Sequence, residues 1–221
     1  MKKIKRTFVF IRNKGLYSFV KECIDRVIDN YYEIYFNIDT KGYLTKEDLE
    51  IDHPESIDYG TVYYRHMINA LSHIKIDINT STLLDFGCGK GRVLAYAASC
   101  NYEKIIGVEN SKLIEIARAN IEKMKHRKTS DILLEKCDAQ NFEIPSSVNI
   151  IYFYNPFVGL TLEKVIENIY LSYKNSPRKI YIIFFNNGEF EKIIISQKWI
   201  SKTHQSQPHP DISYGLYETD L

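Results

Sequence analysis

From residue 59 onward, the hydrophobic pattern alternates between short apolar runs and stretches with helical spacing. Seven runs predict strands, over residues 82–86, 104–108, 132–137, 148–154, 179–185, 199–205 and 212–218. Five stretches predict helices, over residues 59–74, 92–98, 111–125, 160–173 and 188–197. Because apolar strands alternate with helices, we expect an α/β fold with a doubly wound, mostly parallel sheet. The last two strands have no helix between them, so at least one of them must run antiparallel.

A further helix is predicted before this region, beginning at Leu16. Its apolar positions have three- and four-residue spacing, and they are Leu16, Phe19, Val20, Cys23, Ile24, Val27, Ile28, Tyr31 and Tyr35. The opposite face carries Lys21, Glu22, Asp25, Arg26, Asp29 and Glu33. We expect the apolar stripe to dock on the core, and the acidic residues of the polar face argue against binding to anionic lipid. A polar segment over residues 37–58 then connects this helix to the main unit, so the chain divides into an extension at 1–58 and a domain at 59–221.

The composition is that of an ordinary globular protein, with 44% hydrophobic and 26% charged residues. The 29 basic and 28 acidic residues balance to a net charge of +1, which argues against a chain that binds nucleic acid over its whole surface. The first 21 residues, however, carry seven basic residues and no acidic one. This basic arm suits anionic lipid, nucleic acid or an acidic partner, or else it is a solvated terminus. No apolar run approaches the roughly 20 residues of a membrane span, and we expect a cytoplasmic protein.

Neither a metal site nor a disulfide framework is predicted. The four cysteines lie far apart, without a Cys-x-x-Cys pair. His204, His209 and Asp211 cluster near the C-terminus, but the intervening prolines break the regular spacing of metal ligands. No nucleophile motif of a hydrolase occurs.

The candidate chemistry begins where the first predicted strand passes into its helix. Gly87, Gly89 and Gly91 alternate there, two residues after Asp85. A backbone without β-carbons lets a ligand approach closely, and the helix N-terminus favours an anionic group. The dinucleotide fingerprint would need a third glycine at Arg92, and a phosphate-binding Walker loop would need Ser or Thr after its Gly-Lys pair, so neither pattern fits. Asp85 suits a cationic group of the ligand instead.

The run Leu84-Asp-Phe-Gly-Cys-Gly-Lys-Gly-Arg92 resembles the first motif of class I S-adenosylmethionine-dependent methyltransferases. Three further matches follow in the family's order. Glu109-Asn110 closes the second strand, where the family has an acid that binds both ribose hydroxyls. Asp138-Ala139 follows the third strand, where the family binds adenine. Asn155-Pro156-Phe157 follows the fourth strand, where the family builds its active-site loop.

This resemblance implies S-adenosyl-L-methionine as the cofactor and a seven-stranded sheet in the order 3-2-1-4-5-7-6, with an antiparallel strand seven. The implied cofactor-binding residues are Tyr59, Asp85, Gly87, Gly89, Gly91, Glu109, Asn110, Asp138, Ala139 and Asn155. The implied catalytic residues are Asn155, Pro156 and Phe157. We expect Tyr152 and Phe153, which precede this loop, to be plain sheet core.

The active-site loop favours a nitrogen atom as the methyl acceptor. An amide oxygen and a backbone carbonyl can hold an amine by its N–H groups, and aromatic faces favour a nearby cation. The loop is similar to the Asn-Pro-Pro-Tyr/Phe motif of amino methyltransferases but lacks the second proline, and it is distantly similar to that of seven-strand lysine methyltransferases. The acceptor stays open, with a protein or a small molecule favoured over nucleic acid.

Two other functions remain open at this point. The fold is also compatible with a catalytically silent cofactor-binding scaffold that acts through its basic arm. A nucleotide-sugar or dinucleotide enzyme is the third hypothesis, since related glycine turns serve those ligands as well.

Overall fold

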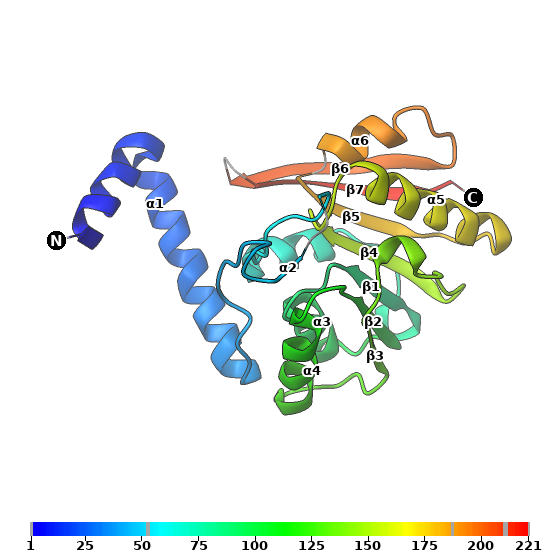
Figure 1. Cartoon of the computed structure of the whole chain (residues 1–221), viewed down its shortest axis with the longest axis horizontal. Helices are drawn as coiled ribbons and strands as arrows, with labels where there is room; N and C mark the ends of the chain where they lie inside the picture. Colours follow the sequence, from blue (N-terminus) through cyan, green and yellow to red (C-terminus); the bar gives the residue numbers. More distant parts are fainter. Residues whose placement is uncertain (1, 52–53, 187, 210–211, 221) are drawn as a thin grey trace.

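A computed structural model describes residues 2–51, 54–186, 188–209 and 212–220. Its centre is a seven-stranded sheet in the order β3-β2-β1-β4-β5-β7-β6 (Figure 1). The strands are β1 (Thr82–Phe86), β2 (Lys104–Val108), β3 (Ile132–Glu135), β4 (Val148–Tyr154), β5 (Tyr181–Phe185), β6 (Ile200–His209) and β7 (Ile212–Thr219). β7 pairs antiparallel with both β5 and β6, whereas the other pairs are parallel. The predicted fold class, strand order and antiparallel strand are therefore confirmed.

Helices cover both faces of the sheet. They are α1 (Lys2–Phe36), α2 (Tyr64–Ser72), α3 (Arg92–Ser99), α4 (Leu113–Lys123), α5 (Gly159–Asn175) and α6 (Gly188–Ile194), with short 3-10 helices η1 (Ile78–Thr80) and η2 (Ala139–Asn141). One core lies between the sheet and α2, α3 and α4, and the other lies between the sheet and α5 and α6. Leu83 points into the first core and its neighbour Leu84 into the second, because side chains alternate across a strand. Because both sides of β1 are covered, all five of its residues are buried.

The helix predicted over 59–74 begins later, at Tyr64. Tyr59 is in an extended conformation, and its backbone N–H and carbonyl both bond to Leu44 at 2.8 and 3.1 Å. A second isolated antiparallel bridge joins Ser56 to Phe157, at the end of β4. The described residues from 54 to 59 therefore lie over the carboxyl ends of the central strands. At the start of the range predicted as a helix, this tertiary pairing overrides the local helical spacing.

The orientation predicted for α1 is wrong. Asp25, Asp29 and Glu33, which the sequence pattern places on a polar outer face, are all buried. Most of the predicted inward stripe is exposed instead, with Leu16 at 64% and Val27 at 68% relative exposure. The helix therefore docks by its acidic face. It also changes direction at Gly15, whose φ of 81° is not helical. Among the described residues, no helix is both long enough and apolar enough to cross a bilayer.

The reason for this inversion is Arg92, the first residue of α3, which is buried beneath α1. Its guanidinium donates to the Asp29 carboxylate at 2.5 Å and to the Glu33 carboxylate at 3.1 Å. The Thr40 hydroxyl accepts a further bond at 2.8 Å, and the guanidinium lies 4.7 Å from the centre of the Tyr64 ring. Buried charges are tolerated only when they are paired and hydrogen-bonded. The acidic face of α1 turns inward because these carboxylates satisfy Arg92.

A second ion pair extends the same interface toward α2. Arg65 donates to both oxygens of Asp25, at 2.6 and 3.0 Å. Asp29 also accepts the backbone N–H of Tyr64 at 2.9 Å, at the start of α2. The buried acids of α1 therefore fix this helix against both α2 and α3.

We expect Arg92→Met to destabilise the fold by about 3–5 kcal/mol, because it leaves Asp29 and Glu33 buried without a counter-charge. Urea unfolding measures the free energy. Adding Asp29→Asn and Glu33→Gln to the same variant removes both orphaned charges and should restore part of the loss. Lys112→Met, which removes an ion pair exposed to solvent, is the matched control and should change little. Equal stability of Arg92→Met and wild type would contradict the assigned role of Arg92.

Candidate functional site

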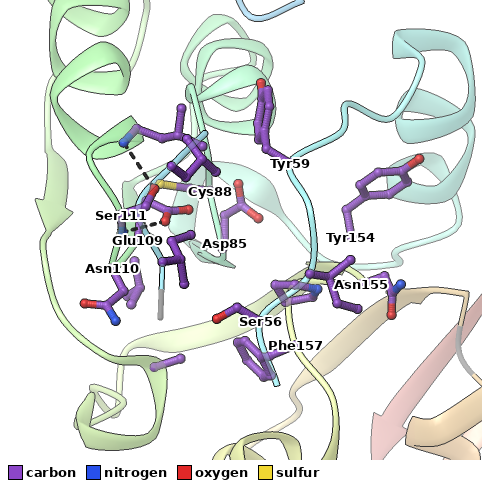
Figure 2. Close-up of a pocket in the computed structure, with 18 of the residues that line it drawn as sticks. Ser56, Tyr59, Asp85, Cys88, Glu109, Asn110, Ser111, Tyr154, Asn155 and Phe157 are labelled. Atoms are coloured by element: carbon purple, nitrogen blue, oxygen red, sulfur yellow. Dashed lines mark hydrogen bonds between the residues drawn. The ribbon is translucent and has the colours of Figure 1, made fainter. Parts of the chain in front are cut away.

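A cleft lies at the carboxyl ends of β1, β2 and β4, where strand order reverses in the doubly wound sheet. It holds about 1040 Å³ of space between protein atoms, including the part open to solvent. In Figure 2, Asp85, Cys88 and Glu109 lie on one side of this cleft, with Tyr154 and Asn155 on the other. Residues 56–62 pass across it. The segment predicted as a mere connection therefore lines the cleft as well.

The glycine turn between β1 and α3 has the left-handed backbone that glycine permits. The φ angles of Gly87, Gly89 and Gly91 are 71°, 52° and 86°. The backbone N–H groups of Gly87 and Cys88 both donate to the carbonyl of Val108, at 2.9 and 3.1 Å. This link fixes the turn to the end of the neighbouring strand β2.

Each of the three glycines is approached by a different part of the chain. A Cβ at Gly87 would lie 2.4 Å from Cβ of Pro156, and one at Gly89 would lie 2.4 Å from the Tyr59 ring. A Cβ at Gly91 would lie 3.3 Å from Ala117 on α4. Gly87 lines the cleft, whereas Gly89 and Gly91 are not among the residues that line it. Gly91 permits helix packing, and Gly89 permits the Tyr59 ring to lie on the turn.

Glu109, at the end of β2, points its carboxylate at the glycine turn. One oxygen accepts the backbone N–H of Gly89 at 3.0 Å, and the other accepts the backbone N–H of Ser111 at 2.8 Å. The side chain is thereby held at the cleft wall before any ligand is present. The next residue, Asn110, lines the cleft too.

Asp85, the fourth residue of β1, is buried but lines the cleft. Within the described part of the chain, no hydrogen bond reaches its carboxylate. Burial and the nearby Glu109 raise the pKa of Asp85 well above the usual aspartate value. The same two carboxylates, together with burial, raise the pKa of the Cys88 thiol. This end of the cleft is therefore poor in positive charge.

Asp138 and Ala139 line the cleft at the end of the segment after β3. The Asp138 carboxylate accepts from the backbone N–H of Gln140 at 3.1 Å and from the Gln140 side chain at 2.8 Å. It thus caps η2 and stays beside the cleft.

The loop after β4 forms the wall opposite Glu109. Asn155 has a φ of 46°, and within the described residues its side-chain amide makes no hydrogen bond. Phe157 is buried, with its ring edge against Phe86 at 6.5 Å between centroids. Tyr154, Asn155, Pro156 and Phe157 all line the cleft.

The prediction that Tyr152 and Phe153 belong to the sheet core is confirmed, since both side chains are fully buried. Ser56, Ser111 and Thr161 also line the cleft, and no sequence motif marks them. Ser56 reaches the site through its backbone pairing with Phe157, which is a long-range contact that local patterns do not carry. In the part of the chain with described coordinates, no group of three metal-binding side chains occurs, and Asp211 lies outside that part.

Comparisons with known proteins agree with this geometry. Residues 83–175 match a family model described as a methyltransferase domain. A SAM-dependent methyltransferase from Aquifex aeolicus is 14% identical, with a TM-score of 0.53 over 70% of this chain and 89% of that chain. An RNA methyltransferase from Salinibacter ruber, solved with S-adenosyl-L-homocysteine, is 15% identical, with a TM-score of 0.55 over 72% and 93% of the two chains. No curated protein matches the sequence.

The fold and the family match together define a class I, Rossmann-like methyltransferase domain. Residues 83–175 form a methyltransferase domain, and the methyl acceptor is not identified. The cofactor of this class is S-adenosyl-L-methionine. The cleft fits that group, because it combines a glycine-rich turn, a buried carboxylate without a hydrogen-bond partner among the described residues and a second carboxylate held at the wall.

The raised pKa of Asp85 predicts a pH-dependent stability without ligand. The folded state keeps the Asp85 proton to a higher pH than the unfolded chain does, so ionised Asp85 costs stability as the pH rises above about 4. Asp85→Asn should therefore be more stable than wild type at pH 8, with the difference vanishing near pH 4, as measured by urea unfolding. Asp131→Asn, at an exposed position, is the control. A difference that is constant across this range would contradict the assignment.

Proposed function

We propose that this methyltransferase transfers the methyl group to a nitrogen atom, carried by a protein side chain or a small molecule. The observation that carries the proposal is Asn155, a residue of the cleft wall whose amide has no partner among the described residues. A polar side chain beside a cleft with its hydrogen-bonding capacity unused is suited to a substrate group.

The cofactor-binding roles form the first part of the proposal. Asp85 faces the cationic amino group of the cofactor, and Glu109 binds the two ribose hydroxyls with its two oxygens. Each Glu109 oxygen still has capacity for a second hydrogen bond beside its bond to Gly89 or Ser111. Asp138-Ala139 bind the adenine and Asn110 contacts the cofactor beside Glu109, and the place of all three in the cleft wall supports these roles. Gly87, Gly89 and Gly91 shape the turn, and Tyr59 covers it.

The acceptor loop supplies the second part. S-adenosylmethionine carries an activated methyl group on a sulfonium, so the protein needs to align the acceptor and exclude water rather than provide strong acid–base groups. The Asn155 amide oxygen and a loop carbonyl accept the N–H bonds of an amine and so orient its lone pair. Pro156 lies against Gly87, which brings this loop into contact with the cofactor turn. Phe157 closes the base of the loop.

The first test concerns the cofactor site. Gly89→Val places side-chain atoms into the Tyr59 ring at a left-handed position, and Glu109→Ala removes both ribose contacts. We expect Glu109→Ala alone to weaken S-adenosyl-L-homocysteine binding roughly a hundredfold, since charge-assisted hydrogen bonds are lost, and the double variant to abolish it in calorimetry. Gly188→Ala, where an added Cβ meets no atom within 4 Å, is the matched control.

Unchanged affinity in the double variant would remove these residues from the cofactor site. The dinucleotide hypothesis is tested by thermal unfolding of the wild-type protein with each ligand. If that hypothesis holds, NAD raises the melting temperature more than S-adenosylmethionine does.

The second test concerns the acceptor loop. Asn155→Ala should lower methyl transfer about a hundredfold while cofactor affinity changes little, because misplacing the acceptor affects the reaction more than cofactor binding. The assay incubates the protein with a radiolabelled methyl donor and cell lysate, then separates protein, nucleic acid, lipid and small molecules. Asn175→Ala, at an exposed position on α5, is the matched control.

Label in the protein or small-molecule fraction supports the proposal, and label confined to nucleic acid or lipid contradicts it. Cofactor binding without label in any fraction would instead favour the silent scaffold.

A further inference from the structure

Among the described residues, the outer face of α1 is largely exposed. Seven large side chains on it are exposed, which we call the α1 stripe: Leu16, Tyr17, Val20, Ile24, Val27, Tyr31 and Ile34. At 3.6 residues per turn they fall within an arc of about 100° along the helix. A continuous apolar stripe of this kind on an exposed helix marks an interaction surface.

The same helix continues into a strongly basic segment. Residues 2–14 carry six basic residues and no acidic one, and they also belong to α1. Figure 1 shows this N-terminal part of α1 standing away from the sheet. An apolar stripe and a segment rich in basic residues thus belong to one helix.

The buried acids remove the objection to an anionic partner. Asp25, Asp29 and Glu33 are neutralised inside the protein by Arg65 and Arg92 and do not face the solvent. The other acid of α1, Glu22, is only partly exposed and is paired with Arg26 at 2.5 Å. The outer side of α1 therefore combines apolar and basic character.

We propose that α1 binds an anionic lipid surface and holds the methyltransferase against it. The α1 stripe would enter the boundary between headgroups and acyl chains, while the basic segment meets the anionic headgroups. Tyr17 and Tyr31 suit this boundary, because their rings are apolar and their hydroxyls polar.

Other occupants fit these features less well. A second copy packed in parallel along the same helix would place one basic segment against the other, which is repulsive. Nucleic acid would be bound through phosphate contacts and base stacking, and it would leave the aliphatic members of the stripe in water. An anionic bilayer satisfies both the charge and the apolar area.

Co-sedimentation of the full chain with vesicles tests the proposal. The protein should sediment with vesicles of equal parts phosphatidylcholine and phosphatidylglycerol, far less with phosphatidylcholine alone, and less as salt is raised. Replacing Lys3, Lys5 and Arg6 by Gln should weaken binding by roughly fivefold per charge removed. Val27→Gln with Ile34→Gln should weaken it by at least about tenfold, since two exposed apolar side chains are lost from the helix.

The matched control is Leu160→Gln with Ile195→Gln. These side chains are as exposed as those of the stripe, at 72% and 86%, but they lie near α5 and α6. This pair should bind vesicles as wild type does. All variants should keep wild-type affinity for S-adenosyl-L-homocysteine, so a failure here is separable from a failure of the proposed function.

Three results would overturn the proposal. The first is that the protein stays in the supernatant with both vesicle types. The second is that the control pair loses vesicle binding as much as the stripe pair does. The third is that the protein is a dimer that the stripe pair dissociates, or binds an RNA oligonucleotide, without binding vesicles.

Discussion

The burial of one guanidinium organises the N-terminal part of this protein. Arg92 lies where α3 begins, one residue after the glycine turn, so it is fixed by the sheet rather than by α1. A buried cation requires counter-charges and acceptors, and Asp29, Glu33 and Thr40 supply them. The orientation of α1 follows from this requirement. An electrostatic constraint here decides which face of a helix is inside, although apolar burial usually does so.

The same contacts connect α1 to the cofactor cleft. The backbone N–H of Thr40 donates to Glu33 at 2.7 Å, and the Tyr59 hydroxyl donates to the Thr40 carbonyl at 2.6 Å. The Tyr59 ring in turn lies on Gly89 in the glycine turn. The extension and the sheet domain therefore share the wall of one cleft. Binding of α1 to a surface would place that cleft at a fixed distance from it.

The chemistry of the cleft is divided between two walls. Glu109 and Asp85 make the β1–β2 side acidic, and burial together with the nearby Glu109 raises the pKa of Asp85. The loop after β4 brings aromatic rings to the opposite side, together with Asn155, whose amide has no hydrogen-bond partner among the described residues. A cationic cofactor suits the first wall and an amine acceptor suits the second. Pro156 against Gly87 is the point where the two walls meet.

The amino-acid sequence alone predicted the strands and the glycine turn, because apolar runs of strand length and alternating glycines are local signals. The order of the strands came from the resemblance to class I methyltransferases. The sequence also placed Asp85, Glu109, Asp138 and Asn155 at strand ends, and parallel strands bring those ends together. Only the tertiary structure decided which face of α1 is buried, that residues 56–62 cross the cleft, and what covers each glycine. Those outcomes depend on partners distant in the chain, whose contacts outweigh the local preferences of a helix face or a helical spacing.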